Sequence, residues 1–416
     1  MAESTEIKKR GRAFRGTLAP LSVPDFRRLL VGNTLWWQAR WMEMIVTGWL
    51  VLELTDSAWQ VALIGFYRSA PIVVVGFFSG PVTDRFGRVR VILLSQAASV
   101  VIVAIIPLLL WADSLAFWHL SVCAVLLGVL WTLSWTARRS LMPDLVGKAG
   151  TVDAMLLENF MQNISRVLGP FAGGAVIQAL GACGCYAVVT GISALSLIAI
   201  FRLSAHPRPA RPKVSPWTLM VEGLRYVRRS PPIFGDVLIT VAMNFLAFPY
   251  MTLLPVFARD ILGQGPVGLG LLGAGNGLGC FLGLFAVSRA RRVFSNGWIF
   301  SVGSFLQAAA LIGFAVSVDF HLSLAMLILS GVGQAGFSVM QSVVVLITAP
   351  DDMRDRAMGA IAIGIGTGPP GRLQVGALAE AFGAPFAVGI TAAAAVLSVV
   401  IITTALPDYR KRTDGG

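Results

Sequence analysis

Long apolar runs, separated by short polar segments, make up most of the sequence. A helix that spans a membrane needs about 20 mostly apolar residues. The chain contains twelve runs of about that length, at 29–53, 60–82, 89–111, 117–138, 154–180, 184–203, 236–261, 266–288, 297–317, 322–346, 357–380 and 385–405. Inside a bilayer each backbone polar group must be satisfied within its own segment, so such runs indicate helices. The pattern predicts an all-α, multi-pass membrane protein with twelve transmembrane helices.

The composition agrees with an integral membrane protein and argues against two other classes. Only 13% of the 416 residues are charged and 56% are hydrophobic, whereas soluble domains carry about 25% charged residues. The net charge of +12 does not indicate nucleic-acid binding, because the charges lie in short clusters between apolar runs and form no basic face. The four cysteines match neither a disulfide framework nor a zinc site.

The positions of lysine and arginine predict how the chain is oriented in the membrane. Cytoplasmic loops are rich in these residues, and here they gather in alternate loops and in both tails. The basic loop residues are Arg85, Arg88, Arg90, Arg138, Arg139, Lys148, Arg289, Arg291, Arg292, Arg354 and Arg356. The opposite loops hold almost none, with Arg259 as the exception. Both termini are therefore expected to be cytoplasmic.

A middle segment, 204–235, separates the first six runs from the last six. It begins with a basic, proline-rich stretch of the kind that forms extended linkers. The apolar residues that share one helical face after this stretch are Trp217, Met220, Val221, Leu224 and Val227. They predict an amphipathic helix on the cytoplasmic membrane surface. The expected domains are a helix bundle over 1–203, a linker over 204–235 and a second bundle over 236–416.

The two halves of the chain also resemble each other in sequence. The stretch GPFAGGAVIQALGA, which starts at Gly169, matches GRLQVGALAEAFGA, which starts at Gly371, at several glycine and alanine positions. Shared apolar composition can produce a weak repeat of this kind. The alternative is a true duplication, which predicts two pseudo-symmetric six-helix bundles with the same orientation in the membrane.

The stretch GPVTDRFGRVR, residues 80–90, lies between the second and third runs. Gly80 would allow two helices to approach closely, and Gly87 would permit a tight turn. Asp84, Arg85 and Arg88 can form a charge cluster at the cytoplasmic surface. A solvated basic loop that only sets the orientation of the chain is the alternative.

This stretch resembles the loop motif G-x-x-x-D-R-x-G-R of the major facilitator superfamily. Other segments, among them ISRVLGPFAGG and FPYMTLLPVFARD, look like the drug- and siderophore-exporting branch that includes the enterobactin exporter. The resemblance implies a transporter that alternates between two access states. It also implies that the cluster at 80–90 latches the two halves together in one of them. Asp84 would then face the start of the eleventh helix, near Asp351, Asp352 and Asp355.

A second glycine-rich stretch, GPFAGG, lies in the fifth run. Gly169, Pro170, Gly173 and Gly174 would bend the helix and allow close packing against a neighbour. The stretch resembles the end of the antiporter motif that many exporters of the superfamily carry there, which favours a gating role and export. Helix packing alone is the alternative.

Charged residues inside the apolar runs are the strongest indication of a site. Each costs about 2.5–3.5 kcal/mol at the centre of a bilayer on insertion scales. At 1.5 Å per residue, Arg40 lies about 16 Å from the start of its run, close to mid-membrane. Arg68 and Arg166 lie at similar depths, and Arg372 lies somewhat past the midplane. Glu43 follows Arg40 by one helical turn, so the two residues can form a structural pair.

One glutamate at this depth cannot neutralise four arginines. A cavity with excess positive charge suits an anionic or catechol-like substrate, or uses chloride or water as a partner. Polar residues expected within reach are Gln162, Asn163 and Gln374, and the nearby tryptophans Trp36, Trp37, Trp131 and Trp135 offer stacking surfaces or simply pack. The stretch 119–136 of the fourth run contains no arginine, in contrast to some proton-driven drug antiporters of the superfamily.

No motif in the sequence indicates an enzyme. HExxH, GxSxG and P-loop patterns are missing, and the three histidines are isolated, so we expect no cofactor and no metal. Without a nucleotide-binding motif, uphill transport must use an ion gradient; the proton is the expected coupling ion and Glu43 the candidate titrating group. The expected function is efflux of an amphipathic or anionic small molecule. The expected partners are this substrate, the coupling ion and membrane lipid, and the resemblance implies a protein of the bacterial inner membrane. The alternatives are an importer of an organic anion and a lipid flippase or exporter.

Overall fold

The computed structural model describes residues 18–204, 223, 225–350 and 353–406. Helices make up nearly all of this part of the chain, and it contains no strand. The all-α expectation is therefore confirmed. The predicted surface helix at Trp217, Met220, Val221 and Leu224 lies outside the described residues, whereas Val227 is buried against the second half of the chain.

The first half begins with a short 3₁₀-helix, η1 (Ala19–Ser22), and a long helix, α2 (Pro24–Thr55). The second run is divided at Ala70 into α3 (Ala58–Ser69) and α4 (Pro71–Phe86), because Pro71 has no N–H to continue the helix. Then come α5 (Arg88–Trp111) and α6 (Phe117–Ile200). The backbone of α6 leaves the helical conformation at Gly147 (φ 73°) and Gly181 (φ 68°), so α6 contains three successive helical segments.

In the second half, the seventh run is the most irregular. It consists of α8 (Pro231–Ala242), a π-helix η2 (Met243–Ala247), a 3₁₀-helix η3 (Phe248–Leu253), α9 (Leu254–Val256) and a second π-helix η4 (Phe257–Ile261). Regular helices follow: α10 (Pro266–Ala290), α11 (Asn296–Val316) and α12 (Phe320–Thr348). The eleventh run is split into α13 (Arg354–Ile365) and α14 (Gly368–Phe382), and α15 (Ala384–Ala405) is the last helix.

By length and apolar composition, nine helices among the described residues can cross a membrane. This differs from the twelve predicted spans. The segment Ala149–Ile200 counts once although it contains the fifth and sixth runs. The eleventh run is divided between α13 and α14, neither of which is long enough alone. The helix α2 is continuous, but Arg40 and Glu43 interrupt its apolar sequence. The protein is a multi-pass membrane protein, and the number of twelve spans remains a prediction.

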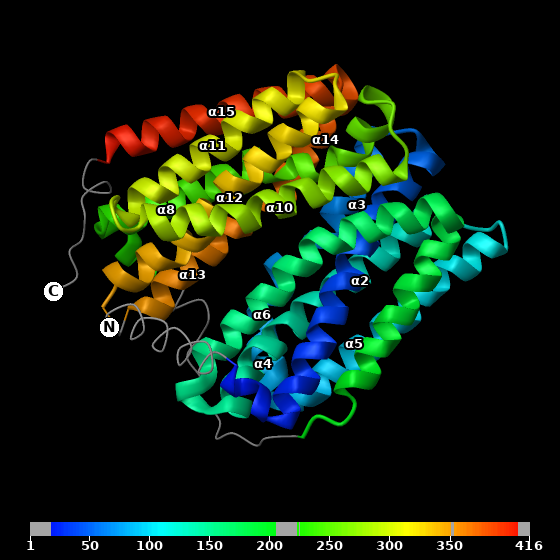
Figure 1. Cartoon of the computed structure of the whole chain (residues 1–416), viewed down its shortest axis with the longest axis horizontal. Coiled ribbons are helices and arrows are strands. Elements are labelled where there is room, and N and C mark those ends of the chain that lie inside the picture. Colours follow the sequence, from blue (N-terminus) through cyan, green and yellow to red (C-terminus); the bar gives the residue numbers. More distant parts are fainter. Residues whose placement is uncertain (1–17, 205–222, 224, 351–352, 407–416) are drawn as a thin grey trace, which may run out of the picture.

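Two groups of helices, α2 to α6 and α8 to α15, lie beside each other (Figure 1). They meet where α3 packs on α14, where α6 packs on α10 and, more narrowly, where α2 meets α9. Small residues permit this approach: a Cβ added at Gly65 of α3 would lie 2.7 Å from the Thr252 side chain of η3. The largest cluster of buried apolar side chains includes residues of both groups, such as Ile45 and Leu254.

Candidate functional site

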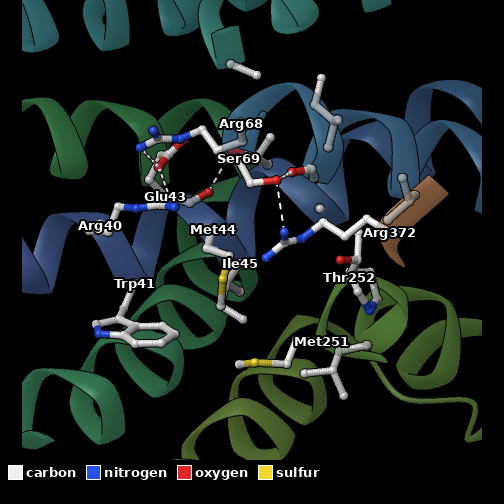
Figure 2. Close-up of a pocket in the computed structure, with 18 of the residues that line it drawn as sticks. Arg40, Trp41, Glu43, Met44, Ile45, Arg68, Ser69, Met251, Thr252 and Arg372 are labelled. Carbon is white, nitrogen blue, oxygen red and sulfur yellow. Dashed lines mark hydrogen bonds and ion pairs between the residues drawn. The ribbon is translucent and has the colours of Figure 1, made fainter. Parts of the chain in front are cut away.

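A cavity of about 280 Å³ lies between the two groups of helices (Figure 2). From the first half it is lined by side chains of α2, α3 and α6, and from the second half by η3, α9, α10 and α14. A second cavity, of about 170 Å³, shares Arg40, Arg68, Ser69, Trp131 and Arg372 with the first and is therefore adjacent to it.

Three of the predicted intramembrane charges form one cluster in this cavity. Arg40 Nη1 lies 3.0 Å and Arg68 Nη2 lies 3.1 Å from the same oxygen, Glu43 Oε2. The predicted Arg40–Glu43 pair is thus present, but α3 adds a second arginine to it (Figure 2). Arg68 Nε and Nη1 are buried without a hydrogen-bond partner among the described residues. The cluster can therefore still donate hydrogen bonds to a ligand.

Arg372 reaches the same cavity from α14 in the second half. Its Nη1 donates a hydrogen bond of 2.9 Å to the Ser69 hydroxyl of α3, so the bond connects the two halves (Figure 2). Three arginines and one glutamate line the two cavities. Because arginine stays protonated in proteins, the site carries an excess of two positive charges, as the sequence analysis expected.

Aromatic and thioether side chains form much of the remaining cavity wall. Trp37, Trp41, Trp131, Met44 and Met251 line the larger cavity. The indole N–H groups of the three tryptophans are buried without a partner among the described residues. Arg40 also lies over the Trp131 ring, 5.9 Å from its centroid. Such a wall can contact a flat apolar body while the arginines hold a negative group.

The other predicted site residues lie elsewhere. Arg166 of α6 donates to Asn276 Oδ1 (2.8 Å) on α10 and to Gln334 Oε1 (2.7 Å) on α12, so it connects the two halves outside the cavity. Gln162, Asn163 and Gln374 are not among the side chains that line either cavity. These four residues therefore do not line the two cavities in this conformation, and their part in substrate binding or coupling remains a prediction.

The stretch at 80–90 behaves in part as expected. Gly87 has a φ of 82° and forms the turn between α4 and α5, which explains its identity. Gly80 does not support a close helix contact, since an added Cβ would meet no atom within 4 Å. Arg88 pairs with Asp144 of α6, and Arg85 lies over the Phe86 ring.

Asp84 is exposed and has no hydrogen bond or ion pair with any residue that the structure describes. The predicted cluster of Asp84 with Arg88 is therefore not formed in this conformation. Asp351 and Asp352, which Asp84 was expected to face, lie outside the described residues. The latch between the halves remains a prediction.

The GPFAGG stretch packs closely on α10 of the second half. A Cβ added at Gly174 would lie 3.0 Å from the Cα of Gly270, and one added at Gly270 would lie 2.6 Å from the carbonyl oxygen of Pro170. Gly169 and Gly173 face Trp41 and Met42 of α2 in the same way. Close packing is thus a role of these four residues, and a part in gating remains a prediction.

The sequence analysis missed a buried polar network in the first half. Arg138 was assigned to a cytoplasmic loop, but its side chain is fully buried. It donates to Gln96 Oε1 (3.1 Å) and to Asn33 Oδ1, and Asn33 in turn donates to Glu158 Oε1 (3.1 Å). The polar residues Asn33 and Gln96 inside apolar runs were the available signal. No group of three or more potential metal ligands occurs within the described ranges.

Comparisons with known proteins agree with these features. A sequence model of the family described as "transmembrane secretion effector" matches residues 15–413. The chain is 28% identical to the multidrug efflux pump Tap of Mycolicibacterium fortuitum, over 82% of this chain and 86% of that one. It is 23% identical to the enterobactin exporter EntS of Salmonella typhi (77% and 79%) and 23% identical to the staphyloferrin A transporter of Staphylococcus aureus (82% and 86%).

Solved structures of other transporters share the fold. A bacterial homolog of the human lysosomal transporter Spinster, in an inward-facing and unoccupied conformation, superposes with a TM-score of 0.68 and 16% identity. The match covers 92% of this chain and 95% of that one. A POT family transporter in complex with 5-aminolevulinic acid gives a TM-score of 0.72 and 12% identity, over 92% and 97% of the two chains.

Proposed function

Because the chain belongs to the transmembrane secretion effector family of the major facilitator superfamily, we propose that it exports small molecules by alternating access. The family and the named relatives are transporters, not enzymes. In this proposal twelve helices form two six-helix bundles, over 1–203 and 236–416, and the segment 204–235 links them. The sequence repeat and the two groups of helices in Figure 1 support this arrangement.

The observation that carries the proposal is the charge of the cavity between the halves. Arg40, Arg68 and Arg372 converge there with Glu43 as the only acid among the lining residues, and tryptophans form part of the wall. A substrate with a negative group and a flat apolar body would satisfy both features. The relatives named as a multidrug efflux pump and as siderophore transporters support an amphipathic or anionic substrate.

The contacts between the halves suggest which access state the structure represents. At one end Arg259 of η4 pairs with Asp56 beyond α2 and donates to the carbonyl of Leu52 at 3.1 Å. There Glu380 of α14 also accepts hydrogen bonds from the start of α3. This end is the one predicted to be extracellular from the distribution of Lys and Arg. We assign the structure to an inward-facing state, closed on the outside, in a bacterial inner membrane with cytoplasmic termini.

An ion gradient, most simply of protons, would drive the export, since the sequence contains no nucleotide-binding motif. A second candidate function fits the same cavity: import of an organic anion, for which the excess positive charge is equally suited. A lipid flippase or exporter on the same fold is the third alternative.

Transport into everted membrane vesicles tests the proposal. The substrates are fluorescein, rhodamine 123, a macrolide and a catecholate siderophore, each with and without an imposed proton gradient. Vesicles that lack the protein are the control. Export predicts saturable, gradient-dependent uptake of at least one anionic compound into everted vesicles. Uptake only into right-side-out vesicles would indicate the importer, and lipid scrambling without solute flux would indicate the flippase. No flux of either kind would refute a transport function for these compounds.

A further inference from the structure

The most deeply buried acid of the described residues is not in the cavity. Asp236 lies on α8, five residues after the start of the helix, and its side chain has an exposed fraction of 0%. Neither carboxyl oxygen has a hydrogen-bond partner within the described residues. At 1.5 Å per residue, Asp236 is about 7.5 Å along the helix from its first residue. The sequence analysis did not identify it.

Among the residues that the structure describes, no cation pairs with this carboxyl group. The elements packed against α8 are α11, α12, α13, α15 and η2. Their described titratable or charged side chains are His321, at the far end of α12, and Arg354 and Arg356, at the start of α13. Arg354 donates to the Ala349 carbonyl and Arg356 to the Met353 sulfur. An unpaired carboxylate in such surroundings is very unfavourable, so this conformation accommodates the neutral, protonated acid.

The surroundings of Glu43 are the opposite. Two guanidinium groups lie within 3.0 and 3.1 Å of Glu43 Oε2, and charge-assisted hydrogen bonds of this kind favour the ionised form. Glu43 is therefore poorly suited to carry a proton in this conformation, although the sequence had made it the candidate. The buried acid of the second half is the better one.

Polar residues lie between Asp236 and the cavity, although the Asp236 carboxyl group hydrogen-bonds to none of the described residues. Thr240 follows Asp236 by four residues on α8, so the two side chains share one face of the helix. Asn244 follows four residues later, in the π-helix η2. Asn244 Nδ2 donates to the Thr240 carbonyl (2.9 Å), and Gln341 Nε2 of α12 donates to the Thr240 hydroxyl (3.0 Å). Asn244 lines the second cavity together with Arg372. This row of polar residues thus starts one helical turn from the buried acid and ends in the cavity that Arg372 lines.

The same face of α8 contacts the broken eleventh run. A Cβ at Gly364 would lie 2.8 Å from Thr240 Cγ2, and the Thr367 hydroxyl donates to the Val241 carbonyl (3.3 Å). Thr367 lies in the break between α13 and α14, and Arg372 follows one turn into α14. A movement of α13 away from α8 would therefore change the surroundings of Asp236 and the position of Arg372 together.

We propose that Asp236 is the proton-binding carboxyl group of the transporter, coupled to the arginine cavity through Thr240 and Asn244. The inference rests on the proposed function as a gradient-driven exporter. In the conformation described, Asp236 holds one proton as a carboxylic acid. When α8 and α13 separate and water reaches the group, the carboxyl O–H bond breaks and the proton passes to water, which leaves a carboxylate.

Infrared spectroscopy of the purified protein in lipid vesicles tests the protonation state without any substrate. The C=O stretch of a carboxylic acid is distinct from the bands of a carboxylate. Wild type at pH 7 should show a buried-acid band that Asp236→Asn loses and Glu43→Gln retains. Asp153→Asn, which alters a partly exposed acid of α6, is the matched control and should also retain it. A band that is missing in wild type, or unchanged in Asp236→Asn, would overturn the proposal.

A second variant tests the origin of the infrared band even if Asp236→Asn does not fold, because it leaves Asp236 unchanged. The buried acids among the described residues are Glu43, Glu158 and Asp236. In the double variant Glu43→Gln/Glu158→Gln, a remaining buried-acid band can come only from Asp236 within this set. Its persistence supports the proposal, and its loss contradicts it.

Fluorescein transport in reconstituted vesicles tests the coupling. Asp236→Asn, which keeps the size of the neutral acid, should retain exchange of fluorescein at equal pH but lose accumulation against a gradient driven by a pH difference. Gradient-driven accumulation at the wild-type level by this variant would refute the role of Asp236. If wild type exchanges no fluorescein, the proposed function fails for this compound while the infrared result on Asp236 still stands.

Discussion

Replacing Arg372 by glutamine should weaken the binding of an anion much more than that of a cation. In this structure the guanidinium donates to only one protein group that the described contacts include, the Ser69 hydroxyl at 2.9 Å. Losing one hydrogen bond from a charged group costs about 1.5–3 kcal/mol of stability. Two unit charges about 4 Å apart at an effective dielectric of 20 interact by about 4 kcal/mol before desolvation is subtracted. A net third of that value weakens binding of an anion about tenfold.

Binding to purified protein measures this effect, with fluorescein as the anion and rhodamine 123 as a cation of similar shape. Arg372→Gln should raise the Kd of fluorescein about tenfold or more and leave that of rhodamine 123 nearly unchanged. Arg372→Lys, which keeps the charge but not the planar fork, is the matched control and should lose less affinity. An equal loss for both dyes in Arg372→Gln, or a wild-type preference for the cation, would refute the reasoning.

Three further substitutions have distinct expected outcomes. Asp84→Asn should shift the protein toward the inward-facing state, because the predicted latch between the halves loses its acid. It should not destabilise the protein, since Asp84 has no described partner in this conformation. Cysteine accessibility from the two sides measures the shift, and an unchanged ratio would contradict it. Gly174→Ala should increase accessibility from the outer side, since its Cβ would lie 3.0 Å from Gly270 Cα; tight closure would count against this contact. Arg138→Gln should lower the free energy of unfolding by about 1–3 kcal/mol, because it leaves Asn33 Oδ1 and Gln96 Oε1 without this donor. Thermal denaturation measures the loss, and an unchanged midpoint would show that the network is not essential.

The sequence was sufficient to predict those features that depend on the membrane environment and on the backbone alone. Apolar run length indicated where the helices lie, and the divided runs still match their positions. Arg40, Arg68 and Arg372 could be assigned to a cavity because a charge at that depth is too costly to face lipid. The turn at Gly87 followed from the lack of a side chain that would oppose a positive φ.

Features set by helix packing could not be predicted from residue spacing. The depth of a residue in a run does not fix the direction in which its side chain points, which explains why Gln162 and Asn163 do not reach the cavity. Arg138 stood at the end of an apolar run and looked like a loop residue, but α6 continues past it and turns it inward. Asp236 stood at the start of a run, where an acid usually meets water. It is buried because other helices of the second half pack on α8.

The central claim is that an anionic substrate binds between Arg68 of the first half and Arg372 of the second. Anomalous diffraction from crystals grown with tetraiodofluorescein would locate the iodine atoms of an anionic probe directly. The account predicts iodine peaks inside the cavity, with the carboxylate of the dye within hydrogen-bond distance of Arg372 and loss of the peaks in Arg372→Gln. Peaks confined to the protein surface, or an anion bound away from all three cavity arginines, would contradict it.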